Sequence, residues 1–139
     1  MAGRKGETLN IHLLAAVAIG GSLGSVARYL VAIGAARLVG TGFPWGTLVI
    51  NIVGSFLIGV FAESFALTWN VSQTLRVFLT VGICGGFTTF STFSLDAIVL
   101  MQRGEVRPAA AYIAASVALS ILALVGGLYL VRAFAVSAV

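Results

Sequence analysis

The sequence predicts an all-α membrane protein with four transmembrane helices in a single domain, residues 1–139, and two observations support this fold class. Hydrophobic residues make up 60% of the chain and charged residues only 9%, whereas a soluble domain carries about 25% charged residues. Four continuous apolar runs are each long enough to cross a bilayer, for which a helix needs about 20 residues. Because the runs do not alternate in polarity, a barrel of transmembrane strands is not expected.

Each span has its own sequence features. The predicted spans cover residues 11–36, 43–62, 77–101 and 108–131. The first contains Gly20 and Gly24 in a G-x-x-x-G spacing, which lets membrane helices approach closely. The second is followed by Glu63, and the fourth begins at Pro108, a residue favoured in the first turn of a helix. The short linkers make successive spans antiparallel and leave no room for a soluble domain.

Lysine and arginine are shared almost equally between the two sides of such a bundle. One side would hold Arg4, Lys5, Arg76 and Arg132, and the other would hold Arg37, Arg103 and Arg107. Because the Lys/Arg bias sets the orientation of a membrane protein, a chain with almost no bias is expected to insert in both directions, although so small a difference also arises by chance in short loops. The count therefore favours dual topology and an antiparallel homodimer.

The net charge of +4 does not predict a nucleic-acid partner. Apart from Arg4 and Lys5 the basic residues are scattered singly, so they form no basic face. Arg28 lies about halfway along the first span, where a cation is costly and marks either function or a specific polar partner. We expect a structural role for Arg28, anchoring the span and capping carbonyls, ahead of direct contact with a ligand.

Polar side chains form two stripes inside the spans. They recur every four residues as Thr47, Asn51 and Ser55 in the second span and as Tyr112, Ser116 and Ser120 in the fourth. Residues at this spacing share one face of a helix. Asn51 must face protein or a water-filled path, because an unpaired amide in hydrocarbon costs on the order of several kcal/mol. An interhelical hydrogen bond would satisfy it equally well, but its two aligned neighbours favour a pathway.

The segment GGFTTFSTFS, residues 85–94, interrupts the third span. Gly85 and Gly86 each weaken a helix by about 1 kcal/mol relative to Ala, and Thr88 and Thr89 are β-branched, so the helix is expected to break in this segment. Irregular backbone at membrane depth persists only where it is buried in protein or lines a cavity, and its freed carbonyls are able to bind a cation. Beyond the break, Phe90 and Phe93 share a helix face, with Ser91, Thr92 and Ser94 on other faces.

The side chains in the spans suit a small anion. Hydroxyl and amide donors are numerous, whereas Glu63 and Asp96 are the only acids within or near the spans. A cation pathway would use carboxylates or carbonyls, and a proton-coupled pump would use an embedded acid. The positive edge of a phenyl ring also favours an anion. An enzyme is not expected, since His12 is the only histidine and no nucleophile–base set is visible.

Three segments resemble the Fluc/CrcB family of fluoride channels. They are GGSLGSVARY at 20–29, GTLVINIVGSFLIG at 46–59 and GGFTTFSTFS at 85–94. The resemblance covers all four spans, from about Ile11 to Val131. It implies a dual-topology antiparallel homodimer in the cell inner membrane, with two fluoride pathways built from both subunits, that passively exports cytoplasmic fluoride.

The resemblance also implies roles for individual residues. The fluoride pathway would be formed by Asn51, Phe90, Phe93, Thr47, Ser91, Thr92, Tyr112, Ser116 and Ser120. Backbone carbonyls around Gly85 and Thr88 would hold a structural Na⁺ at the centre of the dimer, and Arg28 would be structural.

Two other functions fit the composition. One is a small proton-coupled exporter of the multidrug type, which also uses four short helices and dual topology. Such an exporter would carry an acidic residue in its first span, but the first span of this chain contains none. The other is a protein that only assembles or packs in the membrane, in which the polar groups within the spans would form hydrogen bonds with nearby groups of the protein. Donor groups in three separate spans count against this second function.

Overall fold

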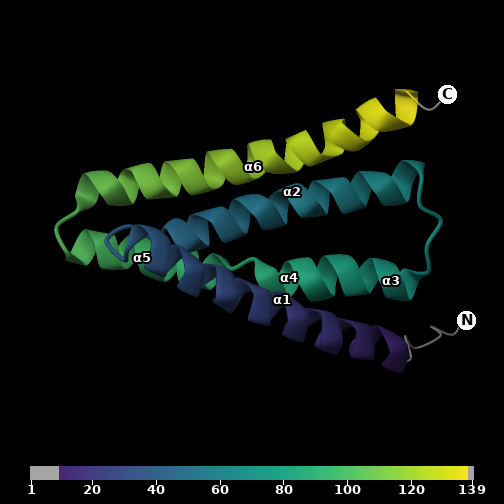
Figure 1. Ribbon diagram of the computed structural model, residues 1–139, viewed down its shortest axis with the longest axis horizontal. Coiled ribbons are helices and arrows are strands. Elements are labelled where there is room, and N and C mark those ends of the chain that lie inside the picture. The colour runs from purple at the N-terminus through teal and green to yellow at the C-terminus, as the bar shows by residue number, and fades with distance from the viewer. Residues whose placement is uncertain (1–9, 138–139) are drawn as a thin grey trace, which may run out of the picture.

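The computed structural model describes residues 10–137, and its regular secondary structure over that range is helical (Figure 1). Four stretches are long and apolar enough to cross a membrane: Ile11–Val39, Trp45–Leu67, Gln73–Gln102 and Val106–Ala135. These stretches confirm the four predicted membrane helices. Arg4 and Lys5, on which the charge count partly depends, lie outside the described residues.

Local sequence explains where the first span starts and stops. Helix α1 (Ile11–Val39) is capped by Asn10, whose side chain accepts a hydrogen bond from the backbone N–H of His12 at 3.0 Å. Asparagine is among the preferred N-cap residues. The helix ends at Gly40, which has φ +82 and donates its N–H to the carbonyl of Ala36. Glycine adopts this left-handed conformation at no steric cost.

All four spans are longer than the hydropathy of the sequence predicts, and in two of them a predicted residue changes its place relative to the helix. Helix α2 (Trp45–Leu67) continues past residue 62, so Glu63, which was expected to follow the span, lies inside it and is buried. Helix α6 (Val106–Ser137) starts before Pro108, which therefore falls within the first turn. A proline is tolerated there because the first-turn amides have no partner within the helix.

The third span is a broken helix, as predicted, but the break lies one turn later than the glycines. It consists of α3 (Gln73–Val77), the π-helix η1 (Phe78–Cys84), α4 (Gly85–Phe87) and α5 (Phe90–Gln102). Thr88 and Thr89 between α4 and α5 are extended, with ψ 157 and ψ 116. Gly85 and Gly86, which were expected to weaken the helix here, remain helical.

Close packing explains the glycines better than backbone flexibility does. A Cβ atom on Gly86 would lie 2.5 Å from the carbonyl oxygen of Gly21 in α1, and one on Gly20 would lie 2.7 Å from that of Phe78. A Cβ on Gly24 would collide with the carbonyl oxygen of Ile83. Glycine at these positions lets α1 lie directly on the backbone of the third span.

The helices form two layers around a small core. Helix α6 lies along α2 on one side of the molecule, and α1 crosses α4 and η1 on the other (Figure 1). Helices α2 and α6 run in the same direction, because a single span separates them in the chain. The core lies where α2, α5 and α6 meet and consists of Leu48, Phe93, Ala97, Leu100, Ala109 and Tyr112. The large apolar side chains elsewhere are mostly exposed, which suits contact with lipid or another chain.

Candidate functional site

The break in the third span is held by a side chain from α2. The amide nitrogen of Asn51 donates to the carbonyl oxygen of Thr89 at 3.0 Å, and the amide oxygen of Asn51 accepts the N–H of Thr89 at 2.8 Å. Asn51 thus pairs with the extended backbone as a neighbouring strand would. An amide nitrogen carries two hydrogens, and this pairing uses one of them. The interhelical hydrogen bond considered for Asn51 therefore exists, and it leaves one donor.

The diverted amides leave two carbonyls of the third span without their helical partners. In an unbroken helix the N–H of residue i bonds to the carbonyl of residue i−4, so Gly85 would pair with Thr89 and Thr88 with Thr92. The N–H of Thr89 instead donates to Asn51, and the N–H of Thr92 donates to the hydroxyl of Thr89 at 3.2 Å. Two of the freed carbonyls are those of Gly85 and Thr88, the residues predicted to hold a cation, whereas the Gly86 carbonyl in the same break accepts the Ser25 hydroxyl at 3.4 Å.

A groove of about 310 Å³ lies between α2, the break, the start of α5 and α6. Its polar walls are Asn51, Ser55, Thr88, Thr89, Ser116 and Ser120, and its rings are Phe90 and Phe93. The structure therefore brings together five of the predicted pathway residues, from three different spans. The apolar residues Ile58, Val117 and Ile121 complete the lining.

Two hydroxyls in this groove have no hydrogen-bond partner within the described residues. The Oγ atoms of Ser116 and Ser120 are both buried and unpaired. A helical serine commonly bonds to the carbonyl four residues earlier, as Ser94 does with Phe90 at 2.9 Å. Buried polar groups are nearly always paired, so two adjacent exceptions on one stripe mark a place where a ligand or water would be bound.

The two phenylalanines of the groove differ in their surroundings. Phe93 is 9% exposed and packs against Tyr112, with ring centroids 5.4 Å apart. Phe90 is 79% exposed although its ring lies 5.4 Å from that of Phe93. Phe93 is thus a fixed wall of the groove, and Phe90 projects from the chain at the edge of the groove.

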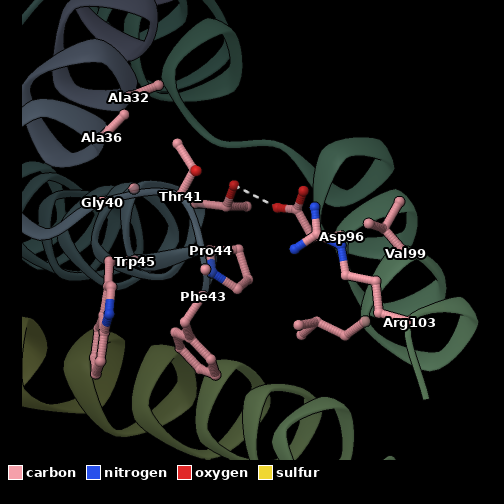
Figure 2. Close-up of a pocket in the computed structure, with 14 residues that line it drawn as sticks. Ala32, Ala36, Gly40, Thr41, Phe43, Pro44, Trp45, Asp96, Val99 and Arg103 are labelled. Carbon is pink, nitrogen blue, oxygen red and sulfur yellow. Dashed lines mark hydrogen bonds between the residues drawn. The ribbon is translucent and has the colours of Figure 1, made fainter. Parts of the chain in front are cut away.

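The hydroxyls of Thr47 and Tyr112 lie at the α1–α2 end of the bundle and meet at a carboxylate. Both donate to the same Oδ2 atom of Asp96, Thr47 at 2.7 Å and Tyr112 at 3.3 Å. Figure 2 shows the Thr47–Asp96 bond as a dashed line beside a cavity of about 200 Å³ that Thr41 and Arg103 also line. Neither Thr47 nor Tyr112 lines the groove, so the structure places them in a separate cluster.

Asp96 was counted as an acid in the sequence but not assigned to a site. An ionisable residue within a span is by default a functional candidate, and its position three residues after Phe93 would have placed it on the pathway helix. Its partners could not be inferred, because they lie on α2 and α6.

The remaining predicted residues lie on the other side of the break. The hydroxyl of Thr89 lies 3.0 Å from that of Thr92 and 3.3 Å from that of Ser91. Arg28 lines a third cavity, of about 340 Å³, together with Thr47, Thr89 and Thr92. Arg28 therefore lies beside hydroxyl groups, and within residues 10–137 no hydrogen bond joins it to a carbonyl. Its structural role stays a prediction.

The sequence of this chain is similar to a known protein family and to several named proteins. Residues 15–128 match the family described as CrcB-like protein, Camphor Resistance (CrcB). The chain is 66% identical over 117 residues to "Fluoride-specific ion channel FluC 1" of Nitrobacter hamburgensis, covering 84% of this chain and 93% of the relative. It is 61% identical over 117 residues, with the same coverage, to "Fluoride-specific ion channel FluC" of Nitrobacter winogradskyi. It is 57% identical over 119 residues to the Rhizobium etli protein of that name, covering 86% of this chain and 95% of the relative.

Proposed function

Because this chain belongs to the CrcB-like protein family, we propose that it is a fluoride-selective channel in the cell inner membrane through which cytoplasmic fluoride leaves passively. Its four membrane-spanning helices make it a multi-pass membrane protein. The similar proteins are named ion channels rather than enzymes. Passive export needs no coupling group, and α1 contains no acid of the kind that a proton-coupled exporter would use.

The observation that carries this function is the pair of buried, unpartnered hydroxyls of Ser116 and Ser120 in the groove beside Asn51. A small, strongly hydrated anion gives up its water only where other donors replace it. Neutral donors supply hydrogen bonds without a cation that would trap the ion, and conduction requires that the ion also leave. A protein with only a packing role would have paired these hydroxyls, as Asn51 and Thr89 are paired.

The three cavities support a path that continues beyond the groove. Thr89 lines both the groove and the cavity beside Arg28. Thr47 lines both that cavity and the one beside Asp96. In the proposed channel, fluoride passes between the α1–α2 end and the groove along these hydroxyls. Ser91, Thr92 and Tyr112 extend the hydroxyl path around Thr47 and Thr89.

An antiparallel homodimer with two pathways is part of the proposal. A groove with polar walls at membrane depth must be covered by protein or face water, and Phe90 projects from its edge with 79% of its surface exposed. A second copy in the opposite orientation would cover both and, by symmetry, present a second groove. The even division of basic residues supports such dual topology.

A structural Na⁺ is also part of the proposal, and the chain has suitable ligands for it. Unwound carbonyls in broken membrane helices coordinate Na⁺, and the carbonyls of Gly85 and Thr88 lack their helical partners because the Thr89 and Thr92 amides bond elsewhere. These two residues would hold the ion, which would supply a positive charge that ties the breaks of two subunits together.

Fluoride efflux from liposomes that contain the purified dimer tests the channel. We expect rapid efflux from these liposomes and none from empty ones. Phe90→Ile and Phe93→Ile should each lower the rate, because isoleucine has no positive ring edge to present to an anion. A folded dimer that released fluoride no faster than empty liposomes would refute the channel. Unchanged flux in both variants would show that the rings serve only packing.

A further inference from the structure

An ion pair joins α2 and α6 farther along the two helices that line the groove. Glu63 lies eight residues beyond Ser55 in α2, and Arg132 lies twelve residues beyond Ser120 in α6. Arg132 Nε donates to Glu63 Oε1 at 2.6 Å, and Arg132 Nη2 donates to Glu63 Oε2 at 3.4 Å. The Glu63 side chain is 11% exposed and that of Arg132 is 52% exposed.

Between the groove and this ion pair the two helices touch through their backbones. A Cβ atom on Gly59 would collide with the carbonyl oxygen of Leu124, and one on Gly127 would lie 2.9 Å from the backbone nitrogen of Val60. Glycine at both positions lets the two backbones approach closely. Within residues 10–137 no side-chain hydrogen bond joins the helices at this contact, so polar contacts that fix their register must lie elsewhere along them.

At the groove end the polar contacts between the two helices centre on a third element. Thr47 of α2 and Tyr112 of α6 both donate to Asp96 of α5, and the Oγ atoms of Ser116 and Ser120 have no hydrogen-bond partner within residues 10–137. The Glu63–Arg132 bonds, in contrast, join α2 directly to α6. A buried ion pair contributes little net stability compared with apolar residues of similar size, but fixing a register is its best-attested use.

We propose that Glu63 and Arg132 form a clamp that sets the axial register of α2 against α6 and so holds Asn51 and Ser55 opposite Ser116 and Ser120. This inference rests on the proposed channel function, because it assigns these two residues to positioning the donors of that pathway. Neither residue lines the groove. A slip by a single residue would move one donor row by about 1.5 Å and rotate it by about 100°, enough to turn its hydroxyls away from the groove.

The deciding variant replaces both charges with apolar side chains of similar length, Glu63→Met with Arg132→Met. We expect its thermal unfolding temperature to stay close to that of the unchanged protein, since such replacements of ion pairs are often neutral or stabilising. We expect its fluoride flux per dimer to fall about tenfold, because binding groups misplaced by about 1 Å lose most of their effect. Arg132→Lys keeps the charge and should keep most of the flux.

Arg76→Gln is the matched control. Arg76 lies near the same end of the bundle and donates to the carbonyl of Phe65 in α2 at 3.2 Å, but it does not contact α6. We expect normal flux from it, so loss of a positive charge at this end would not by itself explain a defect. If the Met pair does not fold, Glu63→Gln alone replaces it, because Arg132 is half exposed and can be solvated without its partner.

A crosslinking measurement reports the register independently of flux. The substitutions Ser55→Cys and Ser120→Cys are made in a Cys84→Ala background, and a short bifunctional thiol reagent is used to crosslink the two new cysteines. We expect efficient joining with the clamp intact and a marked loss in the Met pair. Unchanged crosslinking and flux in the Met pair would overturn the clamp. If the unchanged protein carried no fluoride, the proposed function would fail, while the crosslinking yields would still decide whether the pair sets the register.

Discussion

At the scale of single residues, Asn51 has a structural and a chemical task at once. Its amide oxygen takes the place of the helical partner that the N–H of Thr89 lost when the third span broke, and its amide nitrogen also donates to the Thr89 carbonyl. Satisfying that N–H at membrane depth is what makes the extended residues tolerable, because an unpaired buried peptide group costs about 1–3 kcal/mol. Asn51 also lines the groove, so the residue that stabilises the break belongs to the groove as well.

The Ser116 and Ser120 hydroxyls allow stability and function to be separated. Ser116→Ala and Ser120→Ala remove no hydrogen bond within the described chain, so we expect the unfolding temperature in detergent to be unchanged. Fluoride flux should fall about tenfold or more for each, because a hydrogen bond to a charged group contributes about 1.5–3 kcal/mol. Ser94→Ala is the control, since Ser94 does not line the groove and its hydroxyl bonds to the Phe90 carbonyl of its own helix. Full flux in both groove variants would contradict the proposed pathway.

At the scale of elements, glycine position decides which helices touch. Gly24 and Gly21 lie one turn apart on α1, yet a Cβ on Gly24 would collide with the Ile83 carbonyl, whereas one on Gly21 would meet nothing within 4 Å. The third span therefore fills the space where a Cβ on Gly24 would point and leaves open the space where a Cβ on Gly21 would point. The same contrast separates Gly127, which touches α2, from Gly126, which has open space.

This contrast predicts opposite outcomes for two alanine substitutions on α1. Gly24→Ala should lower stability by about 1–3 kcal/mol, the usual cost of forcing extra volume into a packed contact. Gly21→Ala should leave stability unchanged or raise it by up to about 1 kcal/mol, because alanine favours helix over glycine. Thermal unfolding of both purified variants in the same detergent measures the difference. Equal destabilisation would show that α1 does not pack against η1 as described.

At the scale of the whole molecule, the balance of basic residues sets the expected topology. Because orientation follows the Lys/Arg bias, adding two lysines at the α5–α6 connection, as Gln102→Lys with Glu105→Lys, should drive nearly all chains into one orientation. If the active unit is an antiparallel dimer, this variant alone should lose fluoride flux in cells. Coexpression with a variant biased the other way should restore it. Undiminished flux from the uniformly oriented variant would rule out the antiparallel dimer.

The spans and the donor stripes could be predicted from the sequence because each depends on residues that are neighbours along one helix. Thr47, Asn51 and Ser55 share a face by spacing alone, and the groove contains two of them. Of the residues expected to break the third span, Gly85 and Gly86 are helical, and the chain turns extended at the β-branched Thr88 and Thr89. Glycine weakens a helix, but here its missing side chain matters more, because α1 occupies that space.

The sequence by itself determined the class of the molecule, its four spans and the kind of ion its side chains suit, because a bilayer demands long apolar runs and makes every polar exception costly. Only the tertiary structure decided which polar groups meet. It paired Glu63 with Arg132, placed Asp96 between Thr47 and Tyr112, and left Ser116 and Ser120 without partners. The physical reason is that such pairings depend on the rotation and register of one helix against another, which contacts between helices set and spacing within a single helix does not contain.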